Sequence, residues 1–302
     1  MTELKMRPLI FGEVLFDRFP DGSAVLGGAP FNVAWHLHAF GLNPLMMTRI
    51  GDDAPGAQIE AAMREWGMDC SGLQKDDEHP TGMVEVSFCD GEPTYVIKPD
   101  AAYDFIDARA FPRLDGKWLL YHGSLALRSP CSAAALARLA TDVDNCRFVD
   151  INLRSPWWQR EQIVALMQDA DWVKLNEIEL AGIYPDLASE AERLHCVCSM
   201  ISRQIVLTGG ERGATAIATT DHSWHTVVPE RQSSVVDTVG AGDAFCSVFL
   251  AGQLLDWPLD RTMQRAQAFA SAVVGMRGAT SHERAFYRQF THQWGLEDHP
   301  HV

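Results

Sequence analysis

The sequence predicts a single doubly wound α/β domain with a mainly parallel sheet and a small β extension. Short apolar strands alternate with helical segments along much of the chain. Two other segments alternate apolar and polar residues, which is typical of antiparallel hairpins. The chain has 302 residues, 47% hydrophobic and 22% charged, and therefore enough apolar residues for a large core. No fixed-period repeat or low-complexity linker interrupts it, so we treat residues 1–302 as one domain.

The expected elements follow one another in the order that βαβ units require. A buried strand emerges at Asp17, and a glycine turn leads into a helix that ends at Gly41. The first four elements are expected at 8–19, 27–41, 45–51 and 54–67. Further strands are expected at 118–123, 147–152, 171–176 and 203–210, with helical segments between them. Two long helices, at about 243–256 and 259–275, are expected to close the chain.

Two hairpins interrupt this alternation. Residues 80–97 alternate around the turn dipeptide Asp90-Gly91, and residues 214–228 form a second hairpin pattern. We expect segments of about 14–26 and 80–104 to form the β extension.

Polar residues stand at or just past the ends of the predicted strands, where α/β sheets bind ligands. They are Asp17, Ser124, Asn152, Asn176 and Thr208.

Composition excludes several classes of partner. The net charge of −15 and the pI of about 5.1 argue against nucleic acids and anionic membrane surfaces, which require basic faces. No apolar stretch reaches the roughly 18 residues of a membrane helix, and the first residues lack a cleavage site. The seven cysteines are scattered, and the lone C-x-C at Cys196 and Cys198 suggests no metal site. These features predict a cytoplasmic protein.

The stretch DTVGAGDAF, residues 237–245, contains the densest chemical signal. By itself it is compatible with a glycine turn and an aspartate that caps a helix. A dinucleotide fingerprint is disfavoured because Phe245 occupies the third glycine position. In the third interpretation, the backbone of Gly240, Ala241 and Gly242 binds an anion while Asp243 acts as a general base. The lysine-containing P-loop motif is absent from the sequence.

Two separated motifs resemble the ribokinase-like (PfkB) carbohydrate kinases. DTVGAGDAF resembles the C-terminal signature of that family, and GGAPFNVAWHLHAFGLNPLMMTRIGDD, residues 27–53, resembles its N-terminal signature. The resemblance extends over most of the chain. It implies a ribokinase-like three-layer α/β/α sandwich with a mainly parallel central sheet and a small β-lid, ATP and Mg²⁺ as cofactors, and a sugar hydroxyl as phosphoryl acceptor.

The resemblance also assigns roles to individual residues. Asp243 matches the catalytic base, and Gly240, Ala241 and Gly242 match the anion hole. Residues that match the sugar site are Asp17, Gly27, Gly28 and Asn32. Asn176 and Glu179 match an N-x-x-E element that organises magnesium and phosphates, partly through water. Thr208 and Gly210 match the nucleotide site.

Some of these residues also have simpler interpretations. Taken alone, Glu179 could be a solvated helix charge and Asn32 an exposed helical polar residue. His36, His38 and His122 are interpreted as structural. A monovalent cation, often potassium, is common in the family, and Asp237 and Thr238 would form part of its site opposite the backbone near residues 278–279. A homodimer formed through the lid is also common in the family.

Three local features resemble bacterial fructokinases, and predict D-fructose as substrate and fructose 6-phosphate as product. They are HGSLAL (122–127), DINLRSPWW (150–158) and GEPTYVIKPDAAYDFI (91–106). Asn152, Arg154 and Tyr103 are candidate substrate residues on this basis. A surface arginine and a tyrosine packed within the lid remain the alternatives. Leu15 stands where ribokinases usually have asparagine.

Other functions remain open at this point. On the same fold the substrate could be 2-keto-3-deoxygluconate, ribose or a nucleoside. A sensor that binds sugar without catalysis would be expected to lose Asp243 or the glycine pair beside it, and both are present. A dinucleotide dehydrogenase is disfavoured because no G-x-G-x-x-G follows the first strand.

Overall fold

The computed structural model describes residues 4–89, 92–229 and 235–296. The chain divides into two compact units. The first unit comprises Met1–Pro8, Lys117–Leu125 and Asp144–Ala279, and the second comprises Leu9–Gly116, Ala126–Val143 and Thr280–Val302. None of the helices in the described ranges is long and apolar enough to cross a membrane.

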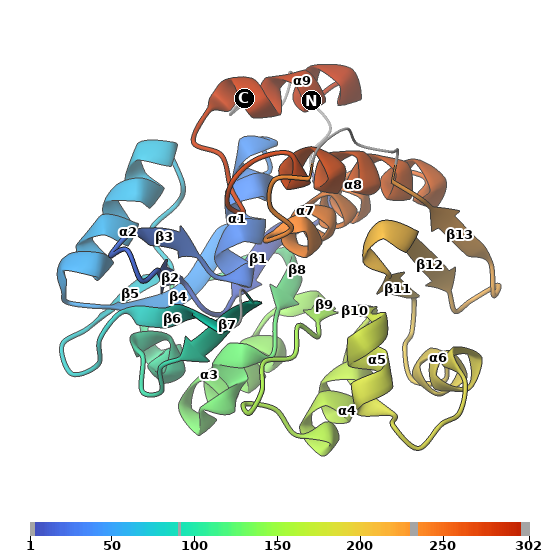
Figure 1. Cartoon of the computed structure of the whole chain (residues 1–302), viewed down its shortest axis with the longest axis horizontal. Coiled ribbons are helices and arrows are strands. Elements are labelled where there is room, and N and C mark those ends of the chain that lie inside the picture. The colour runs from blue at the N-terminus through green and yellow to red at the C-terminus, as the bar shows by residue number, and fades with distance from the viewer. Residues whose placement is uncertain (1–3, 90–91, 230–234, 297–302) are drawn as a thin grey trace. The chain divides into compact units, whose positions relative to one another are not determined.

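A mainly parallel sheet forms the centre of the first unit (Figure 1). Its strands lie in the order β13-β12-β11-β10-β9-β8, and β8 to β11 pair in parallel. The strand bounds are β8 (Lys117–His122), β9 (Asp144–Asp150), β10 (Trp172–Asn176), β11 (Gln204–Thr208), β12 (Ala214–Ala218) and β13 (Trp224–Val227). The last two strands are antiparallel, which confirms the predicted second hairpin.

Helices cover both faces of this sheet, with α7 and α8 on one face and α4, α5 and α6 on the other (Figure 1). Their bounds are α4 (Arg160–Gln168), α5 (Glu177–Ile183), α6 (Glu190–Cys198), α7 (Ala241–Leu254) and α8 (Leu259–Val274). Apolar strand residues such as Val173 and Ile205 are fully buried against the helices. This alternation of buried strands and amphipathic helices forms the expected α/β layers.

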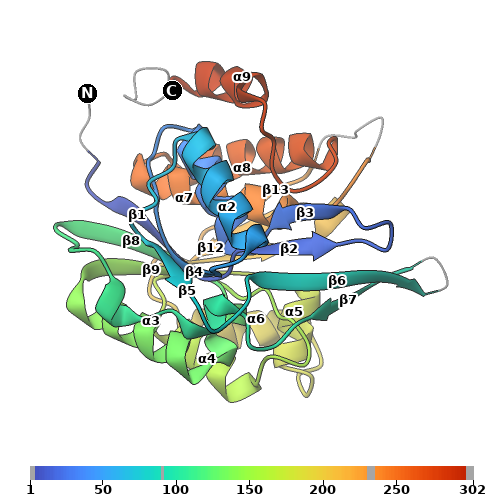
Figure 2. The same cartoon turned by 90° about the vertical axis from the view of Figure 1, so that its left-hand side faces the viewer.

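The second unit contains two sheets. Strands β1, β4 and β5 pair in parallel, and β1 enters this unit at Leu9. A separate sheet has the order β3-β2-β6-β7 (Figure 2). The strand bounds are β1 (Arg7–Phe11), β2 (Leu15–Arg18), β3 (Ala24–Gly27), β4 (Leu45–Gly51), β5 (Leu73–Asp76), β6 (Gly82–Cys89) and β7 (Glu92–Ile97). The β6–β7 pair confirms the first predicted hairpin, although its turn, Asp90-Gly91, lies outside the described residues.

The described residues of the second unit form four α-helices, with bounds α1 (Ala29–Ala39), α2 (Ala54–Trp66), α3 (Pro130–Asp142) and α9 (Arg284–Trp294). Short 3₁₀ turns occur in the chain at η1 (Ala102–Phe105), η2 (Ala108–Ala110), η3 (Leu125–Arg128) and η4 (Gly210–Arg212). Helix α2 shows how local sequence sets an element's ends. The Asp53 side chain accepts a hydrogen bond from the Gly56 amide at its start, and the left-handed Gly67 ends it.

Two sequence expectations were wrong about these elements. The predicted strand at 8–19 is two strands, β1 and β2, because Gly12 has a φ of 144° and leaves the extended conformation. A Cβ atom on Gly12 would lie 2.6 Å from Pro30 Cγ, so only glycine allows this close approach. Helix α9 follows the two helices that were expected to close the chain.

Helix α9 packs against α1 and α2 through its aromatic face. Tyr287 is almost fully buried, and its hydroxyl is 3.0 Å from His36 Nδ1. His38 Nε2 is 3.0 Å from the carbonyl oxygen of Trp66. Both histidines are therefore enclosed by packing contacts, as expected for structural residues.

Candidate active site

The N-terminus of α7 is shaped by Gly240. This residue is the N-cap and has a left-handed φ of 80°. A Cβ atom on it would lie 2.3 Å from Ala279 Cβ, so the position has no room for a side chain. As a glycine, the N-cap residue supplies no side-chain capping hydrogen bond. The first amides of a helix lack partners inside the helix, so the N-terminus of α7 is a position where an anion can bind.

Asp243 lies in the first turn of α7 and is half-buried. It is the third residue of α7, and the N-cap position is held by Gly240. The Ala244 amide donates to the Gly240 carbonyl at 2.8 Å, so the helix begins directly after the glycine. A carboxylate therefore stands beside a group of backbone donors. This arrangement can bind an anion and accept a proton from a neighbouring hydroxyl.

Asp237 connects the loop before α7 to the segment after α8. Its Oδ1 accepts a hydrogen bond from the Val239 amide at 3.0 Å, and its Oδ2 accepts one from the Gly278 amide at 3.1 Å. Thr238 is exposed beside it. The structure thus brings together the two segments that the sequence proposed for a monovalent cation. The carboxylate fixes the loops, so backbone carbonyls would have to supply most of the cation's ligands.

The N-x-x-E element forms a reciprocal cap at the start of α5. Asn176 Oδ1 accepts from the Glu179 amide at 2.8 Å, and Glu179 Oε2 accepts from the Asn176 amide at 2.8 Å. Glu179 Oε1 accepts from the Leu153 amide at 2.9 Å. Glu179 is only 7% exposed, so its interpretation as a solvated helix charge was wrong. Burial raises the pKa of its carboxyl, and nearby Lys174 partly opposes that shift.

These residues fit a hydrated magnesium ion better than a fully protein-bound one. Each Glu179 carboxylate oxygen uses one lone pair on a backbone amide and keeps another for a water molecule. Within the described part of the chain, no group of three or more His, Cys, Asp or Glu side chains could hold a metal. Magnesium commonly binds one or two carboxylates, several waters and substrate phosphates. Glu179 could hold such an ion through water.

Thr208 is the register partner of Asn176 on the neighbouring strand β11. The two predicted nucleotide-binding positions therefore end adjacent strands, as parallel pairing requires. Gly210 has a φ of 58°, and no atom lies within 4 Å of where its Cβ would be. The chain just past the end of β11 therefore leaves room for a flat or charged ligand group.

Asn152 and Arg154 follow strand β9. Asn152 is half-buried with a left-handed φ of 40°, and Ser124 Oγ donates to the adjacent Ile151 carbonyl at 2.7 Å. Arg154 is exposed, and its guanidinium donates to the Leu153 carbonyl at 3.3 Å. Their contact with substrate remains a prediction.

A buried ion pair that the sequence analysis missed lies beneath these strand ends. Lys174 on β10 and Asp150 on β9 are register partners, and Lys174 Nζ lies 3.0 Å from Asp150 Oδ1. Asp150 is fully buried. Burial alone would lower the pKa of Lys174, but the nearby acidic groups, Asp150 first, raise it. The sequence did carry a signal: Asp150 in RFVDIN and Lys174 in DWVKLN are opposite charges that interrupt two apolar strands.

The four residues that match the sugar site of the family, Asp17, Gly27, Gly28 and Asn32, lie in the second unit. Gly28 is the N-cap of α1, and its φ is 108°. A Cβ atom on Gly28 would lie 2.8 Å from the Glu13 carbonyl oxygen, and one on Gly27 would lie 3.5 Å from Asp17 Oδ2. The Asn32 amide donates to the Gly28 carbonyl at 2.8 Å, and Asn32 is only 4% exposed. The alternative of an exposed polar residue is therefore wrong for Asn32.

Tyr103, a candidate substrate residue, is fully buried in the second unit. A Cβ atom on Gly82, at the start of β6, would lie 2.6 Å from its ring. Its hydroxyl accepts a hydrogen bond from Arg128 at 3.1 Å, and burial raises the pKa of the phenol. No part of the side chain is exposed to a ligand in this conformation. The structure therefore favours the packing interpretation for Tyr103.

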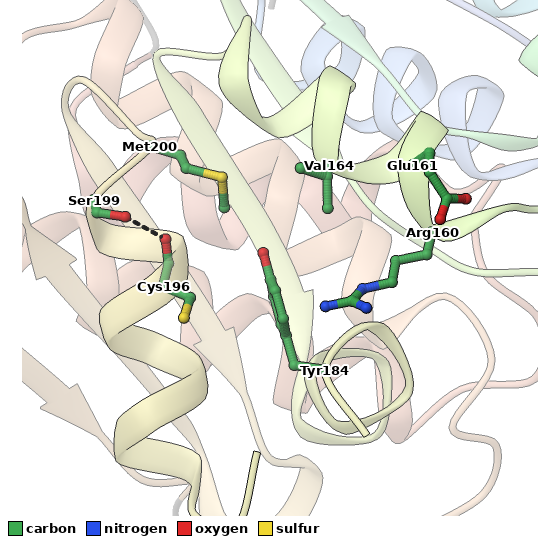
Figure 3. A pocket seen from close by; sticks show the side chains of 7 residues that line it. All are labelled: Arg160, Glu161, Val164, Tyr184, Cys196, Ser199 and Met200. Carbon is green, nitrogen blue, oxygen red and sulfur yellow. Dashed lines mark hydrogen bonds between the residues drawn. The ribbon is translucent and has the colours of Figure 1, made fainter. Parts of the chain in front are cut away.

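A surface pocket of about 420 Å³ lies elsewhere in the first unit (Figure 3). It is lined by Arg160, Glu161, Val164, Tyr184, Cys196, Ser199 and Met200. None of the predicted site residues lines it. The pocket is thus separate from the candidate active site.

Comparison with known proteins decides the family. The pfkB family carbohydrate kinase profile matches residues 4–285. The chain belongs to this family. Fructokinase-1 from Zea mays is 28% identical over 263 residues, which cover 80% of this chain and 80% of that protein.

Solved structures show the same relationship for this pfkB family kinase. A fructokinase double mutant from Vibrio cholerae O395, in its fructose, ADP and potassium ion bound form, is 25% identical with a TM-score of 0.80. The match covers 95% of this chain and 99% of that one. Aminoimidazole riboside kinase from Salmonella enterica, at 21% identity and a TM-score of 0.81, covers 94% and 99% and shows the shared fold. The predicted family and the predicted α/β kinase fold are both confirmed.

Proposed function

We propose that this pfkB family kinase transfers the γ-phosphoryl group of ATP to the 6-hydroxyl of D-fructose. The observation that carries the proposal is the N-terminus of α7, where Gly240 is the N-cap residue and the half-buried carboxylate of Asp243 lies in the first turn. Fructokinases among the relatives and the solved structures support the choice of sugar.

In the proposed reaction, Asp243 accepts the proton of the sugar hydroxyl as the oxygen forms a bond to the γ-phosphorus. The bond from that phosphorus to the β,γ-bridging oxygen breaks, and ADP leaves. The backbone at Gly240, Ala241 and Gly242 stabilises the negative charge on the transferring group. The sugar hydroxyls are held by Asp17 and Asn32, with Gly27 and Gly28 allowing close approach, and by Asn152 and Arg154.

The nucleotide would be held at the ends of β10 and β11. Thr208 and Gly210 border the ATP site, and Asn176 and Glu179 orient its phosphates and the waters of Mg²⁺. Magnesium supplies neutralising charge to the donor phosphates. Asp237 and Thr238 position the loop whose carbonyl groups would bind K⁺.

The four-stranded sheet of the second unit is proposed as a lid over the sugar. A lid would exclude water and limit ATP hydrolysis.

Tyr95 and Val96 on β7 are 52% and 51% exposed, which supports a homodimer formed through this sheet. Light scattering of purified protein, before and after a Tyr95→Glu substitution, would test the dimer. We also infer a cytoplasmic location, because the six cysteines whose side chains are described, all except Cys89, are free thiols.

An ADP-release assay tests the substrate proposal. Fructose, ribose, glucose, 2-keto-3-deoxygluconate and adenosine are compared at matched concentrations, each with and without potassium. The expected result is the highest kcat/KM for fructose, and product analysis should show fructose 6-phosphate. A preference for another sugar or for adenosine would contradict the fructose assignment and leave the kinase assignment intact.

A further inference from the structure

The side chain of Lys174 lies next to the proposed anion hole at the N-terminus of α7. If Gly242 carried a Cβ atom, that atom would be 3.2 Å from Lys174 Nζ. Gly242 is the second residue of α7, so the ammonium group lies next to the first turn of this helix. The lysine side chain is 8% exposed and its partner Asp150 is 0% exposed. The ion pair is therefore accessible to solvent or to a ligand only through the lysine side chain.

The hydrogen-bonding capacity of Lys174 is only partly used. An ammonium group has three N–H donors. Among the described residues the single acceptor that Lys174 contacts is Asp150 Oδ1, at 3.0 Å. Two donors of a nearly buried cation therefore remain for a ligand or for water. Burying a charge with unused donors is costly, and an anion bound beside Lys174 would remove that cost.

Asp150 is itself fixed by two further contacts. The Tyr121 hydroxyl donates to Asp150 Oδ2 at 3.2 Å, and the Cys246 thiol donates to the same oxygen at 3.4 Å. Burial and the Asp150 charge raise the pKa of that thiol, so it remains a neutral donor. The carboxylate thus holds Lys174 in one position, and its second oxygen is occupied by groups other than the lysine.

We propose that Lys174 is a catalytic residue that donates hydrogen bonds to the transferring phosphoryl group, and that Asp150 is the residue that positions it. This inference rests on the proposed function, because the phosphoryl group is taken to bind at the N-terminus of α7. The backbone amides of α7 carry partial charges, whereas Lys174 adds a full positive charge beside them. The lysine also offsets the charges of Asp150 and Glu179, which would otherwise repel an incoming phosphate.

The test uses the full-length enzyme and a pair of substitutions that keeps the core neutral. Lys174→Met alone would leave Asp150 buried without a counter-charge and could unfold the protein. The main variant is therefore Lys174→Met with Asp150→Asn, checked by circular dichroism and urea unfolding. Asp150→Asn alone keeps the cation. Lys75→Met removes an exposed lysine that pairs with Glu60 and serves as the control.

The double variant is expected to lose about 100-fold or more in kcat, as when one transition-state donor is removed. Its KM for the sugar should stay within about threefold of wild type. Asp150→Asn keeps the cation but weakens its positioning, so it should lose a smaller factor in kcat than the double variant, and Lys75→Met should match wild type. The variant should also lose a comparable factor in affinity for ADP with fluoroaluminate, a mimic of the transferring group, measured by calorimetry. A structural role would not change this affinity selectively.

A folded double variant with kcat and fluoroaluminate affinity close to wild type would overturn the role of Lys174. A loss that appears in the KM for the sugar alone would also overturn it. The sugar assay separates this failure from failure of the proposed function. If wild type phosphorylates no sugar but binds ADP–fluoroaluminate, calorimetry on the variants still decides the role of Lys174. A wild type that does not bind ADP–fluoroaluminate overturns both proposals.

Discussion

Gly240 lies directly against Ala279, so close that a Cβ atom on the glycine would be 2.5 Å from the Cα of Ala279. The same glycine has a φ of 80° and begins α7. Two independent physical constraints, space and backbone conformation, therefore select glycine here. The contact fixes the N-terminus of α7, where the proposed anion hole lies, against the segment that follows α8.

Gly240→Ala should reduce both stability and turnover. The left-handed backbone alone costs roughly 1–2 kcal/mol for a residue with a side chain, and the clash with Ala279 adds to this. Urea unfolding and kcat measure the two effects. Gly116→Ala is the matched control, because Gly116 has a φ of 87° but nothing lies within 4 Å of its Cβ position. An equal loss of stability in both variants would show that the Ala279 contact is unimportant.

Asp243→Asn should lower kcat by about 10²- to 10⁴-fold, because the amide cannot accept the proton of the sugar hydroxyl. Binding of the sugar should change little, which equilibrium titration can measure. Asp256→Asn, at an exposed residue that pairs with Lys5, is expected to leave kcat unchanged. Turnover near the wild-type value in Asp243→Asn would refute the assignment of the base.

Glu179→Gln should destabilise the protein by about 1–3 kcal/mol, because glutamine offers one acceptor oxygen where two backbone amides now donate. Urea unfolding measures this loss. Glu192→Gln is the matched control, since Ser189 and Glu192 form the same reciprocal cap at an exposed position. Its loss should be smaller because water can satisfy the freed groups. A lower affinity for Mg-ATP is expected in the first variant only.

His122 should make stability fall in mild acid. Burial lowers the pKa of His122 from its usual 6.5 to about 4, so the folded protein holds it neutral. The unfolded chain binds the proton below about pH 6.5, so stability is lost as pH falls from there towards 4. The loss attributable to this group at pH 5 is about 2 kcal/mol.

Urea unfolding at pH 7.5 and pH 5 tests this expectation. His122→Gln should show a pH dependence weaker by that amount than wild type, whereas His222→Gln, at an exposed histidine, should match wild type. An identical pH dependence in His122→Gln and wild type would contradict the buried neutral imidazole.

Arg128→Met should destabilise the second unit by about 3–5 kcal/mol, because it leaves the Asp104 carboxylate buried without its partner. The two side chains are 6% and 5% exposed, and their closest atoms are 2.8 Å apart. Arg109→Met, which breaks the exposed pair with Asp107, should cost less than about 1 kcal/mol. Adding Asp104→Asn to Arg128→Met should restore part of the stability. No restoration would argue against an ion pair as the source of the loss.

Much of the fold could be predicted because its signals are local. The α7 motif, the two hairpins and the parallel strands were predicted from the periodicity of apolar residues and from the positions of glycines within short stretches of sequence. Helix α9 was missed even though Tyr287, Phe290 and Trp294 are spaced for one face of a helix and are buried. The split between β1 and β2 was hidden, because Gly12 is required by contact with Pro30, which is distant in sequence.

The sequence by itself determined the family, the alternation of strands and helices over most of the chain, and the residues proposed for the base and the anion hole. Only the tertiary structure showed that Glu179 is buried and that Tyr103 is enclosed by packing. It also paired Lys174 with Asp150 beside Gly242. The physical reason is the separation in sequence of the residues that interact. Backbone conformation and periodicity are set by neighbours in sequence, whereas burial and the pairing of charges depend on which strands the fold places side by side.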